Sequence, residues 1–189
     1  MNNMNYFKAI IFTFLFVILS VSCKKENNFL KEIESDWLIK GNANWSFSNN
    51  IIRGEINEGD GFMYSKKRYR NFVLKVEFKP DSTINSGVFI RCKNDSINPL
   101  NCYEFNIWDN HPKQEFRTGS VVLKSFPLAK VNTVGKWNTY KIKCVDNHLQ
   151  AWINNVLVAD LVDENLAEGY LGLQASGNGT VQFRNMKLN

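Results

Sequence analysis

The sequence has few of the residues from which metal sites and hydrolase triads are built. Its 189 residues include only two histidines, His111 and His148, and four cysteines, none of which form a CxxC pair. A structural zinc site is therefore not expected. The sequence also has no GxSxG motif and no glycine-rich phosphate-binding motif, which argues against a serine hydrolase and against phosphate binding.

A strong charge of either sign is also missing. Lys and Arg total 23 and Asp and Glu total 18, so the formal net charge is only +5. The basic residues are scattered along the chain and form no basic helix. Nucleic acid is therefore not an expected partner.

The one long hydrophobic run lies near the N-terminus, at residues 9–19, directly after Lys8. This run is too short to cross a bilayer comfortably as a helix. Together with the small residues before Cys23 it is typical of an export signal, and the position of Cys23 resembles the lipobox of bacterial lipoproteins. We predict a lipoprotein signal peptide over residues 1–22, a lipid anchor on Cys23 and a polar tether over residues 23–34. A plain secreted protein with an incidental Cys23 is the alternative. The lipid anchor predicts a protein of the bacterial cell envelope, periplasmic or surface-exposed, held to the membrane by this anchor only.

The rest of the chain consists of short, strand-like segments separated by turn residues. No segment shows a long helical period, and there is no internal repeat or second domain. About a dozen short strands at this spacing are typical of an antiparallel β-sandwich of the jelly-roll kind. We therefore predict a single all-β domain over residues 35–189. The expected strands are residues 45–47, 51–55, 61–65, 71–78, 87–91, 103–108, 118–123, 140–145, 149–153, 156–160, 170–174 and 181–188.

The chemistry is expected in residues 85–109, NSGVFIRCKNDSINPLNCYEFNIWD. This stretch is typical of two strands joined by a polar loop, and alternation puts the apolar side chains of both strands on one face. Rings stack on the apolar faces of sugars, and amide, carboxylate and guanidinium groups bond to hydroxyls, so the other face would suit a sugar. A cross-strand ion pair between Arg91 and Glu104 on a solvated face is the alternative. The side chains predicted on this second face are Phe89, Arg91, Glu104, Asn106 and Trp108.

The polar groups here permit one type of acid–base chemistry. Glu104 and Asp109 are five residues apart and would point to opposite faces of a regular strand, so the paired-carboxylate mechanism of glycosidases is poorly supported. Removal of a proton next to a carbonyl needs only one base and a donor to the developing enolate oxygen. Glu104 or His111 would be the base, Arg91 and Asn85 the donors, and Asp109 an orienting group. The predicted catalytic residues are Glu104, Asp109, His111 and Arg91, and the predicted substrate-binding residues are Asn85, Phe89, Asn106 and Trp108.

Three cysteines lie in the predicted domain. Cys92 and Cys102 stand at the two ends of the hairpin loop, and export would permit a disulfide between them. Strict alternation puts them on opposite faces, so the predicted bond requires a bulge or an irregular strand end. Cys144 is expected to be a buried free thiol. Calcium near Asp109 stays open because jelly-roll domains often bind it, but no ligand cluster is readable and no cofactor or metal is predicted.

Several short motifs follow one another in a recognisable order. They are Asn85-Ser86-Gly87 with Arg91, Tyr103-Glu104 with Asp109, Thr118-Gly119, Trp137-Asn138, GYLGLQ at residues 169–174, and Phe183-Arg184-Asn185. In this order, from about Trp37 to the C-terminus, the chain resembles the 3-keto-disaccharide hydrolase family. Three positions depart from the family's commoner pattern: Val122 stands where Tyr is frequent, Asn106 where Gln follows the Tyr-Glu pair, and Ser176 where His is frequent.

The resemblance implies a concanavalin-like jelly roll and an exported or lipid-anchored bacterial protein. It also implies cleavage of glycosides whose sugar carries a 3-ketone. Such a ketone acidifies the C2 proton, and loss of this proton expels the C1 substituent, after which water adds. We therefore predict an enzyme that cleaves 3-keto-glycosides or 3-keto-disaccharides. A non-catalytic carbohydrate-binding lipoprotein of the cell envelope is the alternative.

Overall fold

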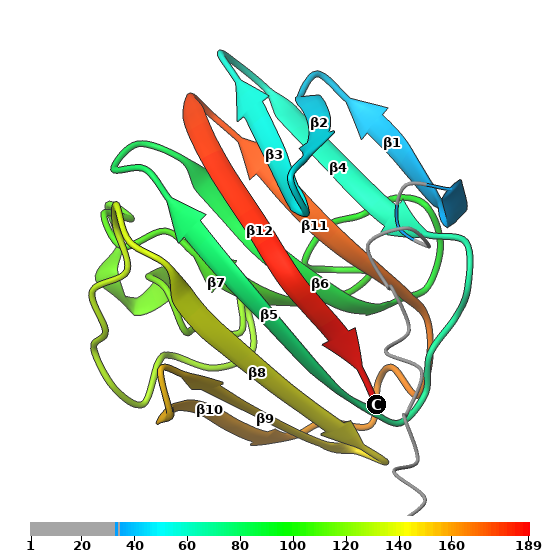
Figure 1. Cartoon of the computed structure of the whole chain (residues 1–189). Coiled ribbons are helices and arrows are strands. Elements are labelled where there is room, and N and C mark those ends of the chain that lie inside the picture. Colours follow the sequence, from blue (N-terminus) through cyan, green and yellow to red (C-terminus); the bar gives the residue numbers. More distant parts are fainter. Residues whose placement is uncertain (1–32, 34) are drawn as a thin grey trace, which may run out of the picture.

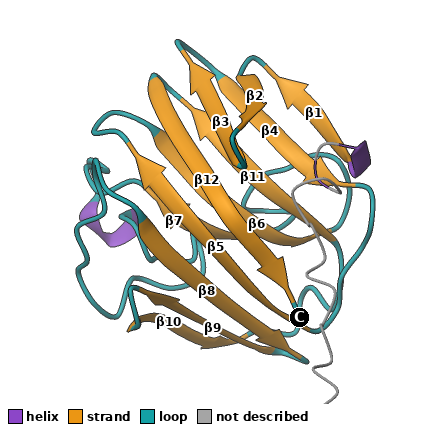
Figure 2. Ribbon diagram, viewed as in Figure 1, coloured by secondary structure: helices purple, strands orange, loops and turns teal. Residues whose placement is uncertain are grey.

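The computed structural model describes residue 33 and residues 35–189, which form two antiparallel β-sheets packed on a shared core (Figure 1). Strands make up most of the regular structure (Figure 2). The antiparallel β-sandwich of the concanavalin-like jelly-roll type is confirmed. The five-stranded sheet has the order β1 (Trp37–Gly41), β4 (Asp60–Ser65), β11 (Tyr170–Ser176), β6 (Asn85–Cys92), β7 (Tyr103–Ile107). The seven-stranded sheet has the order β10 (Val156–Val162), β9 (His148–Ile153), β8 (Asn138–Val145), β5 (Phe72–Pro80), β12 (Gly179–Leu188), β3 (Ile51–Ile56), β2 (Asn44–Ser48).

Alternation of apolar side chains along the strands creates the core. In β5, Phe72, Leu74, Val76 and Phe78 are buried, and the residues between them are half-buried or exposed. Burying each such side chain contributes about 1.5–3 kcal/mol relative to leaving it in water. The inner face of the five-stranded sheet is fixed by this packing, which leaves its outer face available for a site.

The segment between β7 and β8 differs from the prediction. Residues 118–123 were expected to form a strand, but this is wrong, since only Val121 makes isolated bridges, to Phe105 and to Ser125. The Ser125 backbone N–H donates to the Val121 carbonyl at 2.8 Å, and Leu123 has a φ of 62°. A tight turn therefore replaces the strand. Two further elements had not been predicted, strand β1 and a short 3₁₀ helix at Gln114–Phe116.

A β-bulge interrupts the alternation of β6. Tyr170 of β11 pairs with Cys92 and Gly172 pairs with Phe89, so the two residues Ile90 and Arg91 stand opposite Leu171 alone. Arg91 adopts a φ of 51°, a conformation that non-glycine residues rarely take. One extra residue moves every later side chain of the strand to the other face. Cys92 thereby reaches the same face as Cys102.

The predicted disulfide between Cys92 and Cys102 is confirmed, and so is the bulge that this bond was predicted to require. Cys144 is a buried free thiol, also as predicted. Burial raises the pKa of this thiol to about 11, which keeps it protonated and unreactive at neutral pH.

The N-terminal predictions lie almost wholly outside the described residues. The signal peptide over residues 1–22, the lipid anchor on Cys23 and most of the tether stay predictions. Ile33, at the end of the predicted tether, is fully buried in the core, so the domain begins before residue 35. None of the helices in residues 33 and 35–189 is long and apolar enough to cross a membrane.

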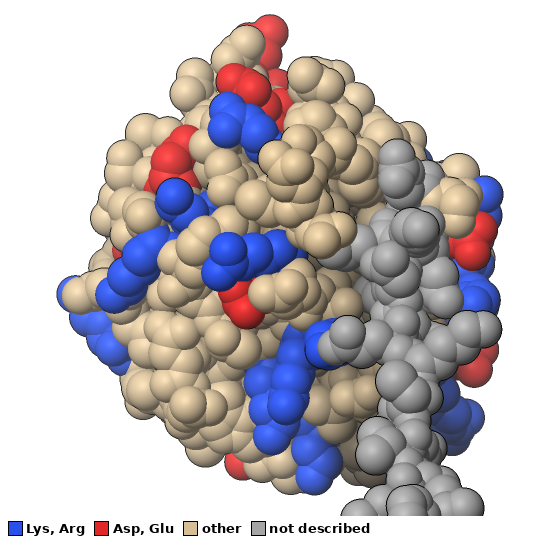
Figure 3. Space-filling view, in the orientation of Figure 1, with Lys and Arg blue, Asp and Glu red and all other residues tan. Residues whose placement is uncertain are grey.

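The face shown in Figure 3, which belongs to the seven-stranded sheet, carries separate groups of Lys and Arg side chains with acidic side chains among them. One such contact is the ion pair between Arg184 and Glu77, at 2.7 Å. On the described part of this face the basic side chains thus form separate groups and no continuous positive surface.

Candidate functional site

A hollow of about 320 Å³ lies on the outer face of the five-stranded sheet, a size within the range of small-molecule sites. One row of its floor runs across four strands, pairing Phe62 with Gln174, Gln174 with Gly87, and Gly87 with Asn106. The next row pairs Phe89 of β6 with Glu104 of β7. The remaining lining residues are Asp60, Asn85, Ile97, Asn98, Pro99, Trp108, His111 and Val122.

Glycines on the floor make room for a ligand beside the carboxylate. Gly87 stands next to Glu104, and a Cβ added there would lie 3.3 Å from both Cγ and Oε1 of Glu104. Gly172 of β11 pairs with Phe89, so this floor position also lacks a side chain. The sheet surface is therefore lowest where the carboxylate is.

Glu104 is held in an environment that disfavours its charge. Its side chain is buried, with only 6% of the residue exposed, and it makes no hydrogen bond or ion pair with any residue in the described part of the chain. Burial, and to a smaller extent the negative charge of Asp60, raises the pKa of Glu104 from 4.5 to about 8. A carboxylate with a pKa near the working pH is well suited to proton transfer.

His111 reaches the hollow from the segment that follows β7. Its Nδ1 accepts a hydrogen bond from the Lys113 backbone N–H at 3.0 Å, so the neutral ring carries its proton on Nε2. The ring lies edge-on to Trp108, with 4.4 Å between centroids. With Nδ1 occupied, the neutral ring is a hydrogen-bond donor through Nε2. Of the two bases considered from the sequence, this leaves Glu104.

The predicted substrate-binding residues all line the hollow, but they differ in what they can offer. Phe89 is fully buried and packs edge-on against Phe62. Asn106 uses its Nδ2 on the Phe116 carbonyl and its Oδ1 on the Ile107 N–H, so it secures the wall. Asn85 and Trp108 lie at the edge and are only partly buried, which leaves them available to a ligand.

Sequence reasoning missed two polar groups that line the hollow, Gln174 and Asp60. The amide of Gln174 is 6% exposed, and its Oε1 has no hydrogen-bond partner within the described residues. A buried amide of this kind needs partners, and a bound ligand can supply them. Alternation in β11 would have indicated Gln174, because Leu171 and Leu173 point into the core. Asp60 had no local signal, since only sheet pairing brings β4 close to Glu104.

Arg91 does not lie in the hollow, which corrects its predicted catalytic role. The guanidinium is fully buried, donating to the Arg70 carbonyl at 2.7 and 3.1 Å and to the Leu166 carbonyl at 2.9 Å. The bulge that brings Cys92 to the outer face has turned Arg91 inward. The alternative of a cross-strand ion pair between Arg91 and Glu104 is also wrong, because Arg91 bonds to loop carbonyls instead.

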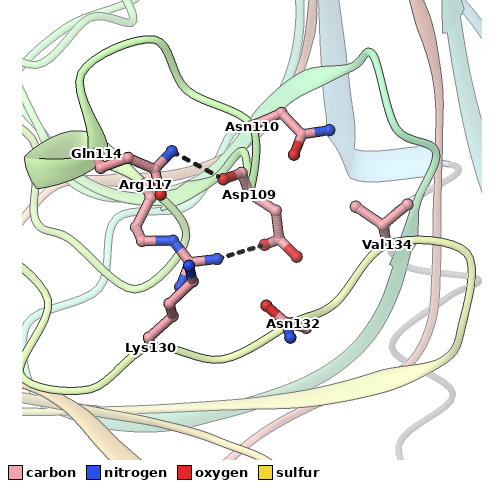
Figure 4. A pocket seen from close by; sticks show the side chains of 7 residues that line it. All are labelled: Asp109, Asn110, Gln114, Arg117, Lys130, Asn132 and Val134. Atoms are coloured by element: carbon pink, nitrogen blue, oxygen red, sulfur yellow. Dashed lines mark hydrogen bonds and ion pairs between the residues drawn. The ribbon is translucent and has the colours of Figure 1, made fainter.

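Asp109 lines a second hollow, of about 360 Å³, and does not join Glu104 (Figure 4). Its carboxylate accepts hydrogen bonds from the backbone N–H and, at 2.9 Å, the hydroxyl of Thr133, and it lies 4.0 Å from the Arg117 guanidinium. Gln114 donates to the main-chain oxygen of Asp109 at 3.2 Å. These contacts tie the segment after β7 to the loop before β8, so Asp109 is a structural residue of that junction.

The described residues contain no group of three or more His, Cys, Asp and Glu side chains that could hold a metal ion. Asp109, the residue considered for calcium, is already engaged by Thr133. Ser176, which stands where the resembled family often has His, bonds through its hydroxyl to Asp60 and to the Gly59 carbonyl. It therefore positions Asp60 at the edge of the hollow.

Residues 31–189 match the family described as the 3-keto-alpha-glucoside-1,2-lyase-like domain. The chain belongs to this family. The resemblance inferred from the motifs is thereby confirmed over the whole described domain. Together with the neighbours below, the family supports a carbohydrate-active protein of the hydrolase type.

Solved structures with the same architecture include one from Parabacteroides distasonis that is assigned as a glycosyl hydrolase. It shares 25% identity, has a TM-score of 0.69 and covers 78% of this chain and 93% of its own. The carbohydrate-binding module CBM66 from Bacillus subtilis has 18% identity and a TM-score of 0.65 over 82% of this chain and 95% of its own, and shows the fold alone.

In sequence, the chain is 31% identical over 182 residues to a fructan beta-fructosidase of Streptococcus mutans. The match covers 87% of this chain and 12% of that protein. The chain therefore spans only a small part of the length of this curated relative.

Proposed function

We propose that this member of the 3-keto-alpha-glucoside-1,2-lyase-like family cleaves 3-keto-glycosides by removing the C2 proton and expelling the C1 substituent. The observation that carries the proposal is Glu104, a single buried carboxylate without a protein partner, with its pKa raised to about 8, in a hollow of small-molecule size. A glycosidase of the ordinary type needs two carboxylates flanking one bond, and the second carboxylate of this hollow, Asp60, is already engaged by the Ser176 hydroxyl. Proton removal next to a ketone needs one.

The reaction proceeds in steps that Glu104 can serve alone. The ionised carboxylate takes the C2 proton, and the electron pair of the C–H bond passes into the enolate of the 3-ketone. Return of this electron pair forms the C1–C2 double bond and breaks the C1–O bond, and the leaving oxygen takes the proton back from Glu104. Water then adds to the unsaturated ketone and yields the free 3-keto sugar.

The developing enolate oxygen needs a hydrogen-bond donor, and Arg91 is buried elsewhere. Two groups that line the hollow take this role in the proposal. His111 offers Nε2–H because its Nδ1 accepts a hydrogen bond from the Lys113 N–H. Within the described residues the Gln174 side chain makes no hydrogen bond, so its Nε2–H is available as a second donor. Donors aimed at developing charge in a water-poor site typically contribute about 10²–10³-fold in rate each.

A test of the proposal is release of the alcohol from methyl 3-keto-α-glucoside by the purified protein. We expect Glu104→Gln to lower kcat/KM by about 10²–10⁴, the usual contribution of a general base. The matched control is Glu55→Gln, which changes the same functional group at an exposed position of β3 and should leave the rate unchanged. Equal rates for wild type and Glu104→Gln would refute the mechanism.

A non-catalytic carbohydrate-binding function is the second candidate. It is favoured by the match to a small part of a much larger fructan-cleaving enzyme, in which the corresponding region would be one module among others. Binding of a sugar measured by calorimetry, without product from any 3-keto-glycoside, would support this candidate. Turnover that depends on Glu104 would exclude it.

The predicted lipoprotein signal and Cys23 place this activity in the bacterial cell envelope as a further part of the proposal. Mass spectrometry of the protein isolated from membranes should find a lipid on Cys23. A Cys23→Ala variant should appear in the soluble fraction. An unmodified Cys23 on the mature protein would contradict the anchor.

A further inference from the structure

Three large apolar side chains are exposed beside the hollow, Leu100, Leu123 and Phe126, and we name them the apolar rim. The exposed fractions of these residues are 78%, 56% and 64%. Leu100 follows the wall residue Pro99, and Leu123 follows the wall residue Val122. The rim therefore belongs to two loops that both supply residues to the wall.

Ring contacts connect the rim to the polar floor. Trp108 and His111, which line the hollow, are in edge contact at 4.4 Å between centroids. His111 contacts Phe116 at 5.7 Å, and Phe116 contacts Phe126 at 6.2 Å. An unbroken series of rings thus leads from the carboxylate site to the exposed Phe126.

The fold holds the rim in place. The turn that presents Leu123 is closed by backbone bonds from Lys124 and Ser125 to the Val121 carbonyl, at 2.9 and 2.8 Å. Leu123 keeps a φ of 62°, in the left-handed region that a branched side chain rarely adopts. The Cys92–Cys102 disulfide closes the loop that carries Leu100. A strained backbone that displays an apolar side chain to water indicates a function for that display.

The one charged side chain within this turn is directed elsewhere. Lys124 lies between Leu123 and Phe126 in the sequence, but its Nζ pairs with the Asp163 carboxylate at 2.9 Å. The rim side chains themselves have no hydrogen-bonding group. A group that binds there must therefore gain its affinity from apolar contact.

We infer that the apolar rim binds an apolar aglycone, an alkyl or aryl group attached at C1 of the sugar whose ring occupies the polar floor. This inference rests on the proposed function and names its substrate class. The hollow supplies the carboxylates of Glu104 and Asp60, the amides of Asn85 and Gln174, and the ring N–H of His111 for the hydroxyls and the ketone of one sugar. The rim supplies apolar surface for the alkyl or aryl group of the leaving alcohol.

The test compares two substrates with leaving alcohols of similar acidity, the 3-keto derivatives of methyl and hexyl α-glucoside. If about three methylene groups leave water on the rim, kcat/KM for the hexyl glycoside should exceed that for the methyl glycoside about 50-fold. Phe126→Ala and Leu100→Ala should each remove about 5- to 10-fold of that preference and leave the methyl glycoside unaffected. Val162→Ala is the matched control, because Val162 is equally exposed, at 67%, but lies on β10.

The outcomes separate this inference from the proposed function. Release of both alcohols at equal kcat/KM would overturn the inference that the apolar rim binds the aglycone, and would leave the proposed function intact. Release of neither would overturn the function, and calorimetry with the unoxidised methyl and hexyl α-glucosides would then decide the rim. At least tenfold tighter binding of the hexyl glucoside supports the rim, and equal binding overturns it. A rim that instead joins two copies of the chain would show as a dimer that Phe126→Ala converts to a monomer, which also overturns the inference.

Discussion

Replacement of Glu104 by Gln should stabilise the protein, and increasingly so as pH rises. Below pH 4.5 the carboxyl is protonated in both the folded and the unfolded chain, and the substitution changes little. Above 4.5 the unfolded chain releases this proton, whereas the folded protein keeps it until about pH 8 because burial disfavours the charge. The folded state thus binds more protons in this window, and the wild-type free energy of unfolding falls as pH rises.

The size of the effect follows from the same two pKa values. At 1.36 kcal/mol per pH unit, the penalty carried by Glu104 is about 1 kcal/mol at pH 5 and about 4 kcal/mol at pH 8. The Gln variant has the same shape and no charge, so it should escape this penalty at every pH. The free energies of unfolding of wild type and Glu104→Gln should therefore diverge by about 3 kcal/mol between pH 5 and pH 8.

Urea denaturation of both proteins at several pH values measures this divergence, because the other titrating groups contribute equally to both and cancel. The kcat/KM of the wild type should rise with pH and level off above about 8, as the base ionises. Parallel stability profiles for the two proteins would show that Glu104 ionises normally, and the argument for a desolvated base would fail.

Three further substitutions test residues that the structure assigns to the scaffold. Asp109→Ala leaves the buried Arg117 without its counter-charge and should lower the free energy of unfolding, measured in urea, by about 3 kcal/mol. The variant should keep the kcat of the wild type, and a loss of kcat would show that Asp109 belongs to the active site. Replacing both Cys92 and Cys102 by Ser opens a short loop and should lower the free energy of unfolding by about 2.5–3 kcal/mol. The stability of this variant should not change when reductant is added, whereas that of the wild type should fall. A wild type that melts at the same temperature with and without reductant would contradict this prediction. The Lys side chain of Arg91→Lys cannot bond to the Arg70 and Leu166 carbonyls at once, so the variant should have a Tm lower by about 4–8 °C, the equivalent of about 2 kcal/mol. An unchanged Tm would show that the hydrogen bonds of the buried guanidinium are dispensable.

Local pattern was enough to predict the fold and the face of β7 on which Glu104 lies. Strands with period-two alternation and turn residues between them require a sandwich, and the two sheets follow. Alternation in β7 alone put Glu104 and Asn106 on one face and Phe105 and Ile107 on the other, as the structure has them. These predictions succeed because each depends on residues within a few positions of one another.

The failures begin where the pattern loses its period or where distant strands meet. Strict alternation along β6 assigned Arg91 to the outer face, but the bulge adds one residue and thereby reverses the face on which the later side chains lie. Asp109 lies two residues beyond Ile107, the last residue of β7, so alternation along the strand no longer applied to it. Alternation in β11 indicates the face on which Gln174 lies, but only the order of strands in the sheet brings Gln174 and Asp60 next to Glu104, and one sequence does not reveal that order.

The bulge at Arg91 also explains why a site with an uncompensated carboxylate can persist. Turning Arg91 inward lets it bond to the carbonyls of Arg70 and Leu166, and the same shift gives Cys92 the face on which it can bond to Cys102. The loop that this disulfide closes carries part of the wall around Glu104. Among the described residues, Arg91 and Leu123 are the positive-φ residues other than glycine, asparagine and aspartate. Arg91 precedes Cys92, whose disulfide closes the wall loop, and Leu123 follows the wall residue Val122. Because departures from local preference that persist in a stable fold concentrate at functional sites, their position around a desolvated carboxylate supports a catalytic hollow over a passive surface depression.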